Sequence, residues 1–354
     1  MTKNISRDKA VTIKDIARSC AVSVVTVSRV LSGSDYPVSA ALRQKILKTA
    51  NELNYRPNLF ARGLKTNQSM EIAIVIPSIT NPFYTSIVSG VEREAVKNGY
   101  NITLYNCHSQ ALSEKTIIEN IINRRIDRLV LSVADRQSLL IKKMVSKGIK
   151  VVLLDCMAPD VPCNQIYFNY YKGSLLETQY LIDKGHRRIA YLGLKPERQS
   201  RIDRMNGFKE ALLQAGLECN ETLLFTFEDP EGGAENIEFK AGFNLARRAL
   251  QAPDRPTAIV AANDMMALGV LSYLNSVNIQ VPAEISVVGF DDSIFSELSH
   301  PAITTVRVPA EQMGEMAARL LLDGNKESTG SNFNIVLEPE LVERNSVAVV
   351  QAGF

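Results

Sequence analysis

Short apolar runs rich in β-branched residues recur along this chain from residue 72 onwards, with helical stretches between them. The runs do not alternate apolar and polar residues, which is typical of parallel strands buried on both faces of a sheet. Their number favours two doubly wound α/β sheets over one, the first ending near Phe168 and the second starting near Arg188. The runs lie at residues 72–77, 102–106, 128–132, 150–155, 165–168, 188–193, 257–263 and 285–291.

The first sixty residues have a purely helical pattern instead. A capping-box-like start at Thr12 opens a first helix, a short link follows it, and Ser23 can cap a second helix. Gly33 can end this second helix in a left-handed conformation, and a third helix is expected from Ser39 onwards. Two short helices joined by a tight turn, with a third packed behind them, form a helix-turn-helix arrangement.

The second of these helices leaves apolar side chains on its surface. Val24 and Val25 lie in its first turn and point away from the face that packs inward. Such valines can pack against thymine methyl groups, and Arg29 can offer two donors to a guanine edge. Ser23 and Thr26 can bond phosphates. The alternative is a small helical bundle docked on the rest of the chain, with the valines buried against it.

The charge of the chain is divided unevenly. Residues 1–66 hold 12 Lys and Arg against 4 Asp and Glu, whereas the remaining residues hold 28 against 34. A basic head on a mildly acidic body indicates that the head alone meets a polyanion, although a solvated charged face has the same composition. Together with the exposed valines, this charge favours DNA as the partner of the head.

A connector with the sequence YRPNLFARGLKTNQS follows at residues 55–69. Pro57 can open a helix at Asn58, but Gly63 and the polar residues after it make a stable isolated helix unfavourable. Its apolar groups, among them Ala61 and Leu64, stand beside Arg and Lys residues. Such a segment can be disordered alone and fold on a partner.

Several classes of protein are disfavoured by what the sequence contains. Five cysteines without a CxxC pair and three scattered histidines indicate neither a zinc site nor a disulfide framework, as in a reducing compartment. The N-terminus has no apolar signal core, and no stretch reaches the length of a membrane span. We therefore expect a cytoplasmic protein without membrane contact.

Polar and aromatic residues follow the carboxyl ends of the expected strands, where doubly wound sheets bind ligands. They suit a polar or polyhydroxylated small molecule held between two domains, although carboxylates at such positions also cap the next helix. GxGxxG, GxxxxGK[ST] and GxSxG motifs are absent, so we expect neither an enzyme nor a cofactor or metal. The strand-end groups are Asn81, Phe83, Tyr84, Asp155, Asn263, Asp264, Asp291 and Asp292.

Long motifs along the chain are similar to those of one protein family. The LacI/GalR family of bacterial transcription regulators has a headpiece and hinge that this chain closely resembles in VTIKDIARSCAVSVVTVSRVLSG and VSAALRQKILKTANELNYRPNLFARGL. The resemblance continues through NPFY, GHRRIAYLG, AANDMMALG, ISVVGFDDS and PAITTV, and so covers nearly the whole chain. It implies a repressor of carbohydrate or sugar-acid genes that binds a pseudo-palindromic operator as a homodimer and responds to a small-molecule effector.

The resemblance also implies the organisation of the chain and its DNA contacts. Val24 and Val25 occupy the family's two specificity positions, and the hinge is expected to insert a leucine wedge into the minor groove. The core resembles periplasmic sugar-binding proteins with two subdomains. The implied DNA contacts are Thr12, Ser23, Val24, Val25, Thr26, Ser28, Arg29, Asn58, Ala61 and Leu64. The implied parts are a headpiece at 1–56, a hinge at 57–69 and a core at 70–354, with an N-subdomain at about 70–168 and 300–332 and a C-subdomain at about 169–299 and 333–354.

The effector contacts of the family map onto one set of core residues. They are Phe83, Arg198, Arg204, Phe227, Asn263 and Asp291, each of which has a cap or a subdomain contact as its alternative role. Several arginines at 195–204 favour a sugar acid or a sugar phosphate, because guanidinium groups match planar anions. A neutral sugar remains the alternative effector.

Two other classes of protein remain as alternatives to a transcription regulator. A transport receptor of the periplasmic type shares the core but needs an export signal and lacks residues like 1–66. An enzyme on the doubly wound scaffold needs a catalytic constellation, which the sequence does not show.

Overall fold

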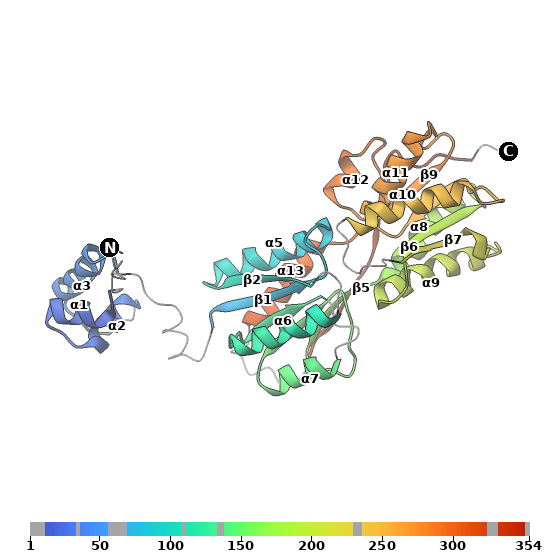
Figure 1. Ribbon diagram of the computed structural model, residues 1–354. Coiled ribbons are helices and arrows are strands. Elements are labelled where there is room, and N and C mark those ends of the chain that lie inside the picture. The colour runs from blue at the N-terminus through green and yellow to red at the C-terminus, as the bar shows by residue number, and fades with distance from the viewer. Residues whose placement is uncertain are drawn as a thin grey trace, which may run out of the picture. The chain divides into compact units, whose positions relative to one another are not determined.

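The computed structural model describes residues 11–32, 36–55, 69–107, 111–132, 138–228, 236–323 and 332–350. The chain divides into two compact units, one up to Ser69 and one from Met70 (Figure 1). Gly33 and the hinge residues Asn58, Ala61 and Leu64 lie outside the described residues.

The smaller unit contains the three expected helices, α1 (Ile13–Cys20), α2 (Val24–Leu31) and α3 (Ala40–Glu52). At the start of α1, the carboxylate of Asp15 accepts hydrogen bonds from the N–H and the hydroxyl of Thr12, at 2.9 and 2.6 Å. Ala21 in the left-handed region, with φ 57°, ends α1 and permits the tight turn into α2. The apolar faces meet in one core built from Ile16, Ala17, Cys20, Val27, Val30, Ile46 and Ala50.

The larger unit holds two sheets, and the first of them is entirely parallel. Helices cover both of its faces, so its central strands are buried on both sides, whereas its two edge strands are partly exposed. One face packs against α5 (Pro82–Lys97) and α13 (Ala310–Leu322), the other against α6 (Ala111–Asn123) and α7 (Ser138–Ser146). In order of pairing its strands are β11 (Asn334–Leu337), β5 (Asn164–Phe168), β4 (Lys150–Leu154), β3 (Arg128–Leu131), β1 (Glu71–Ile76) and β2 (Asn101–Asn106).

The second sheet has the same architecture except at one edge, where β12 runs antiparallel to β10. One face packs against α8 (Tyr170–Asp183) and α9 (Gln199–Gln214), the other against α10 (Ile237–Leu250) and α11 (Asp264–Ser276). A short helix, α12 (Ile294–Leu298), follows the central strand β9. In order of pairing the strands are β12 (Glu340–Val342), β10 (Thr304–Arg307), β9 (Ser286–Asp291), β8 (Ala258–Ala261), β6 (Ile189–Leu194) and β7 (Leu224–Phe227).

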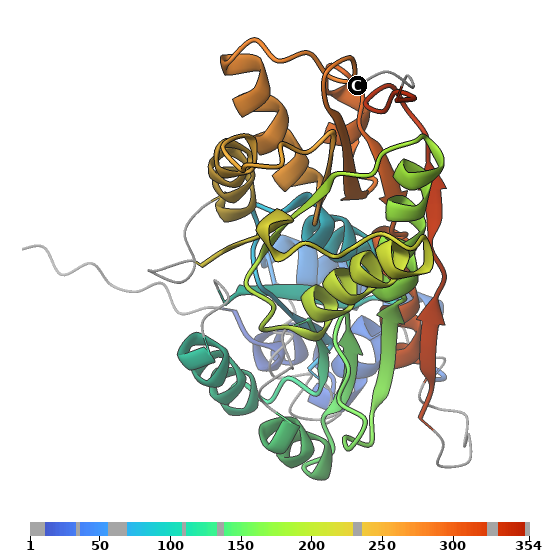
Figure 2. The ribbon, with the colours of Figure 1, turned by 90° about the vertical axis from the view of Figure 1, so that its right-hand side faces the viewer.

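Each sheet with its helices forms a lobe, and the described chain passes between the lobes after β5, after β10 and after β11 (Figure 2). The first crossing lies where the sequence predicted it, but the other two do not. β10 pairs with β9, so residues from 300 to 307 belong to the second lobe and not, as expected, to the first. β11 pairs with β5, so it belongs to the first lobe although 333–354 was expected in the second.

The return of α13 to the first lobe has a packing reason. A Cβ atom on Gly90 of α5 would come within 2.0 Å of the Glu311 carbonyl oxygen, and one on Gly314 of α13 within 2.1 Å of the Ile87 carbonyl oxygen. The two helices therefore touch backbone to backbone, which only glycine allows at these positions. This contact fixes the second crossing between Arg307 and Ala310.

Candidate functional site

The first turn of α2 presents two valines on the surface of the smaller unit. Val24 and Val25 are 37% and 55% exposed, whereas Val27 and Val30 of the same helix are buried in the core. This confirms that the two valines point away from the core of the headpiece. Exposed apolar groups at the N-terminus of the second helix are placed as a helix-turn-helix needs them for the major groove.

Polar groups surround these valines. The Ser23 hydroxyl accepts a hydrogen bond from the Thr26 N–H at 3.1 Å and lies 2.9 Å from the Thr26 hydroxyl. The guanidinium of Arg29 lies 4.0 Å from the centre of the Tyr36 ring, a cation–π contact that orients it. Tyr36 was not predicted, since it lies in the link to α3. The predicted contacts Thr12 and Ser28 are exposed and partly buried, respectively.

In the larger unit, five predicted effector residues line one cavity of about 50 Å³ between the lobes. They are Phe83, Arg198, Arg204, Asn263 and Asp291. Phe227 is not among the lining residues and packs against the apolar core of the second lobe instead. Asn263 also caps α11 by accepting the Met266 N–H at 2.9 Å, so it serves the structure as well.

Arg204 and Asp291 form the floor of this cavity. The Arg204 guanidinium lies over the Tyr170 and Phe290 rings, 4.2 and 4.5 Å from their centres. Its Nη2 is 3.6 Å from Asp291 Oδ1, an ion pair too long for a hydrogen bond. Burial raises the pKa of Asp291 well above its ordinary value, although Arg204 opposes that shift.

The same two residues keep buried polar atoms without a hydrogen-bond partner. Arg204 Nε and Asp291 Oδ1 are both inaccessible to solvent and unpartnered within the described structure. Buried polar groups are normally paired, because an unpaired one loses its hydration without replacement. Two residues that line the cavity, one a donor and one an acceptor, thus keep hydrogen-bonding capacity that the described structure does not use.

Two further arginines lie at the N-terminus of α9. Arg198 is the N-cap residue, and Arg201 in the first turn donates to the Lys195 carbonyl at 3.2 Å. Burial lowers the pKa of Arg201, and the positive charge of Arg198 beside it lowers it further. The turn from loop to helix thus brings Arg198 to the same cavity as Arg204, although the two are six residues apart.

Hydrogen bonds join the lobes across the cavity. Asn81 Nδ2 donates to Glu238 Oε1 at 3.3 Å, and the Tyr167 hydroxyl donates to Asp203 Oδ2 at 2.6 Å. The Tyr170 hydroxyl, at the start of α8, donates to the carboxylate of Asp155 after β4. These contacts hold the cleft in a closed arrangement.

Several lining residues were missed by the sequence reasoning or named only as strand-end groups. Tyr84 and Asp155 follow strand ends and were named as such, and Arg201 was counted among the arginines at 195–204. Glu238 and the underlying Tyr170 were not assigned to the site. Tyr170 follows β5 by two residues, so the strand-end rule could have found it. Glu238 comes from a helix of the opposite lobe, and no local signal points to it.

Comparisons with known proteins agree with both units. A model described as "Bacterial regulatory proteins, lacI family" matches residues 12–58, and one described as "Periplasmic binding protein-like domain" matches residues 178–347. The ribose operon repressor of Escherichia coli (strain K12) is 34% identical over 95% of this chain and 99% of its own length. The chain belongs to the LacI family of bacterial regulatory proteins. Within this family, a helix-turn-helix headpiece joined to such a core makes it a DNA-binding transcriptional regulator.

Other members of the family are similar over the same extent. The PurR repressor of Vibrio atlanticus is 32% identical over 95% of this chain and 98% of its own. A lac repressor dimer bound to operator and the anti-inducer ONPF superposes with a TM-score of 0.81 at 27% identity, over 96% of this chain and 100% of that one. The complex of the regulator CelR with cellobiose gives a TM-score of 0.69 at 30% identity, over 95% and 99%.

A metal site and a membrane-spanning helix are both absent from the part of the chain that the structure describes. Within these ranges, no group of three or more His, Cys, Asp and Glu side chains could hold a metal ion. None of the helices described above combines the length and the apolar character that crossing a bilayer demands.

Proposed function

We propose that this regulator is a cytoplasmic repressor of carbohydrate or sugar-acid catabolism genes and not an enzyme. It binds a pseudo-palindromic operator as a homodimer, and an effector bound between the lobes changes its affinity for that operator. The observation that carries the proposal is that Arg204 and Asp291, each with a buried polar atom that makes no hydrogen bond, line one cavity in a chain with a helix-turn-helix headpiece. The similar lac repressor dimer bound to operator and the similar CelR–cellobiose complex support it.

The size of the cavity supports a closing motion around the effector. A space of about 50 Å³ is far smaller than the roughly 300–1,000 Å³ of small-molecule pockets. A sugar therefore enters only if the lobes separate and the bonds of Asn81 to Glu238 and Tyr167 to Asp203 are exchanged. This exchange couples effector binding to the angle between the lobes.

An exposed apolar surface supports the homodimer. A groove of about 720 Å³ lies at the N-terminal ends of α5, α12 and α13, next to the effector cavity, with which it shares Phe83 and Asp291. Exposed Ile79, Ile294 and Phe295 line its outer part. Contiguous exposed apolar groups in a water-soluble domain mark an interaction surface. A second copy of the chain is the occupant that a two-fold symmetric operator requires, since each copy then reads one half-site.

The hinge prediction concerns Leu64. We expect Leu64→Ala to weaken operator binding on the order of 10-fold or more and to reduce DNA bending, because a wedge stabilises only a deformed duplex, and burying a leucine contributes about 1.5–3 kcal/mol. Effector affinity should stay near that of the parent chain. Band-shift titration with a circularly permuted operator measures both quantities. A chain cut before Pro57 that binds the full operator as tightly as the intact chain would contradict this role of the hinge.

The effector prediction concerns charge. Arg198, Arg201 and Arg204 line the cavity with three carboxylates, those of Asp155, Glu238 and Asp291. Arg204 is balanced by Asp291, whereas Arg198 and Arg201 repel one another and gain from an anion between them. We therefore propose a sugar acid or sugar phosphate, whose hydroxyl groups meet Arg204 and Asp291 and whose anionic group meets Arg198 and Arg201.

Calorimetric titration with matched pairs tests this charge preference. D-Gluconate is compared with D-glucose, and D-ribose 5-phosphate with D-ribose, at low and high salt. We expect the acid or the phosphate to bind at least 10-fold more tightly than its neutral partner, and Arg198→Ala to abolish the difference. Tight binding of a neutral sugar that neither salt nor Arg198→Ala affects would refute the anionic effector. The proposal that the chain is an effector-controlled repressor would still stand.

A further inference from the structure

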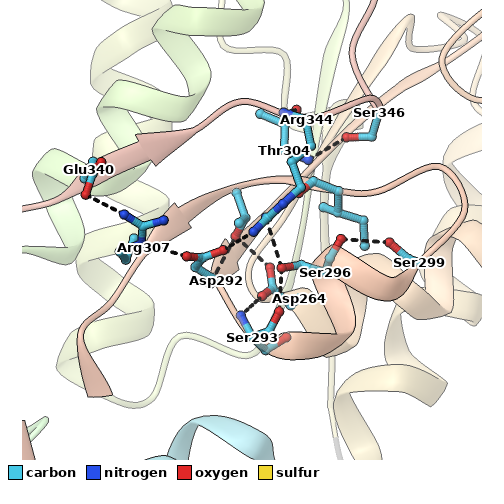
Figure 3. A network of polar contacts seen from close by, with 12 residues as sticks. Asp264, Asp292, Ser293, Ser296, Ser299, Thr304, Arg307, Glu340, Arg344 and Ser346 are labelled. Atoms are coloured by element: carbon cyan, nitrogen blue, oxygen red, sulfur yellow. Dashed lines mark hydrogen bonds and ion pairs between the residues drawn. The ribbon is translucent and has the colours of Figure 1, made fainter. Parts of the chain in front are cut away.

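The end of β9 gives two neighbouring carboxylates different charged partners. Asp291 and Asp292 both have positive φ values, 114° and 56°, which L-residues rarely adopt. Asp291 faces Arg204 in the effector cavity. Asp292 belongs to a separate network of polar side chains, in which it is bonded to Arg307 and Arg344 (Figure 3).

Asp292 is hydrogen-bonded to residues that lie beside both of the later chain crossings. Its carboxylate accepts the Arg307 Nε–H at 2.7 Å and the Arg344 Nη2–H at 2.6 Å. Arg307 is the last residue of β10 before the chain returns to the first lobe, and its Nη1 donates to Glu340 at 2.9 Å. Glu340 is the first residue of β12, after the chain has crossed back. One carboxylate thus ties the end of β9 to both crossings.

Further hydrogen bonds stabilise the turn that follows β9, at residues 291–293. The Val308 N–H donates to the Asp291 carbonyl at 3.3 Å, directly at the second crossing. The buried carboxylate of Asp264 accepts the Ser293 N–H at 2.6 Å and the Thr305 hydroxyl at 2.7 Å (Figure 3). Asp292 itself is largely buried, so its two charge-assisted bonds are shielded from solvent.

We propose that Asp292 is a positioning residue for the effector carboxylate of Asp291. Arg307 and Arg344 anchor Asp292, and this anchor holds the uncommon backbone conformation in which Asp291 faces Arg204. Because Arg307 and its partner Glu340 flank the two crossings, a change in the angle between the lobes moves the anchor and, with it, Asp291. The inference rests on the proposed role of Asp291 in effector binding.

The experiment removes one anchor and asks whether the loss acts through Asp291. Arg307→Gln is the main variant, since Arg307 is 45% exposed and its loss leaves Asp292 bonded to Arg344. Lys184→Gln is the matched control, because Lys184 pairs at 3.8 Å with Glu343, next to Arg344 but outside the network. Affinity for D-gluconate and 6-phospho-D-gluconate is measured by calorimetry in the full chain, with and without Asp291→Asn.

We expect Arg307→Gln to weaken sugar-acid binding at least fivefold in the parent chain and less than twofold in the Asp291→Asn background. Lys184→Gln should bind as the parent does. A role in folding alone would lower the melting temperature and leave the affinity of the folded chain unchanged. Equal losses in the two backgrounds, or no loss in either, would overturn the inference.

A measurement without ligand separates this inference from the effector proposal. Hydrogen exchange of the Val308 and Ser293 amides should be faster in Arg307→Gln and in Asp292→Asn than in Lys184→Gln. The Val308 N–H donates to the Asp291 carbonyl in the anchored turn, and the Ser293 N–H of that turn donates to Asp264, so loosening the turn exposes both amides. If the parent chain binds neither sugar acid, the proposal of an anionic effector is wrong. The exchange rates alone then test whether Asp292 positions Asp291. Unchanged exchange at both amides would overturn the positioning role.

Discussion

Alanine in place of Arg204 is expected to weaken effector binding by on the order of 100-fold. The substitution removes a guanidinium that stacks on Tyr170 and Phe290 and leaves the Asp291 carboxylate buried without its counter-charge. Truncating one partner of such a buried pair costs about 2–5 kcal/mol in binding. Operator affinity without effector should stay within about twofold of the parent value, so the chain still binds DNA but no longer responds.

The comparison uses Arg188→Ala as its control. Arg188 is an exposed arginine of the same lobe whose Nε donates to the Arg255 carbonyl at 3.0 Å, and it does not line the effector cavity. Effector affinity is measured by calorimetry and operator affinity by fluorescence anisotropy, on chains whose melting curves show the folded state. If Arg204→Ala binds the effector with the parent affinity, Arg204 does not contribute to effector binding.

The second large effect is expected at the headpiece. Exchanging Val24 and Val25 for Ser and Asn should change which operator is preferred, because both side chains are exposed at the start of α2 and can meet base edges. Each mismatched base pair costs about 1–3 kcal/mol, and a dimer makes the change in both half-sites, so the parent operator should lose roughly 2–6 kcal/mol.

Selection from a randomised duplex library measures this change in preference. Leu47→Ser is the control, since Leu47 is also an exposed apolar side chain of the headpiece but lies on α3. We expect the double variant to select a sequence that differs at the same positions in each half-site, and the control to select the parent sequence. A uniform loss on all sequences would assign the valines to folding or to non-specific contacts.

Most of the architecture could be predicted from the sequence. Each of the eight apolar runs corresponds to a strand, because β-branched runs buried on both faces form an unambiguous pattern. Four strands were missed, and β11 and β12 show why. They lie at sheet edges, are partly exposed and hold only four and three residues, so they lack a continuous apolar run. The third crossing was misplaced because β11 was missed, and the second because β10, another four-residue strand, was missed.

The candidate site was predictable where a local motif carried it. Asp291 stands in the family motif ISVVGFDDS and Arg204 in the arginine-rich stretch 195–204, and Val24 and Val25 stand out because helical periodicity leaves no inward position for them. Glu238 could not be found this way, since only the closure of the lobes brings it to Asn81. Phe227 was placed by an alignment across a stretch of uncertain length, and its side chain packs into the core of the second lobe instead.

The central claim is that a ligand between the lobes controls binding of the headpiece to a specific operator. The most direct test uses a duplex that the full chain selects from a random library. Fluorescence anisotropy measures the binding of the full chain to this duplex, with and without the sugar acid or sugar phosphate that the chain binds. We predict tight, salt-dependent binding to a pseudo-palindromic duplex and a change in affinity of about 5–150-fold on adding that sugar, absent in Arg204→Ala. Equal affinity for selected and random duplexes, or an operator affinity that the bound sugar leaves unchanged, would contradict the account.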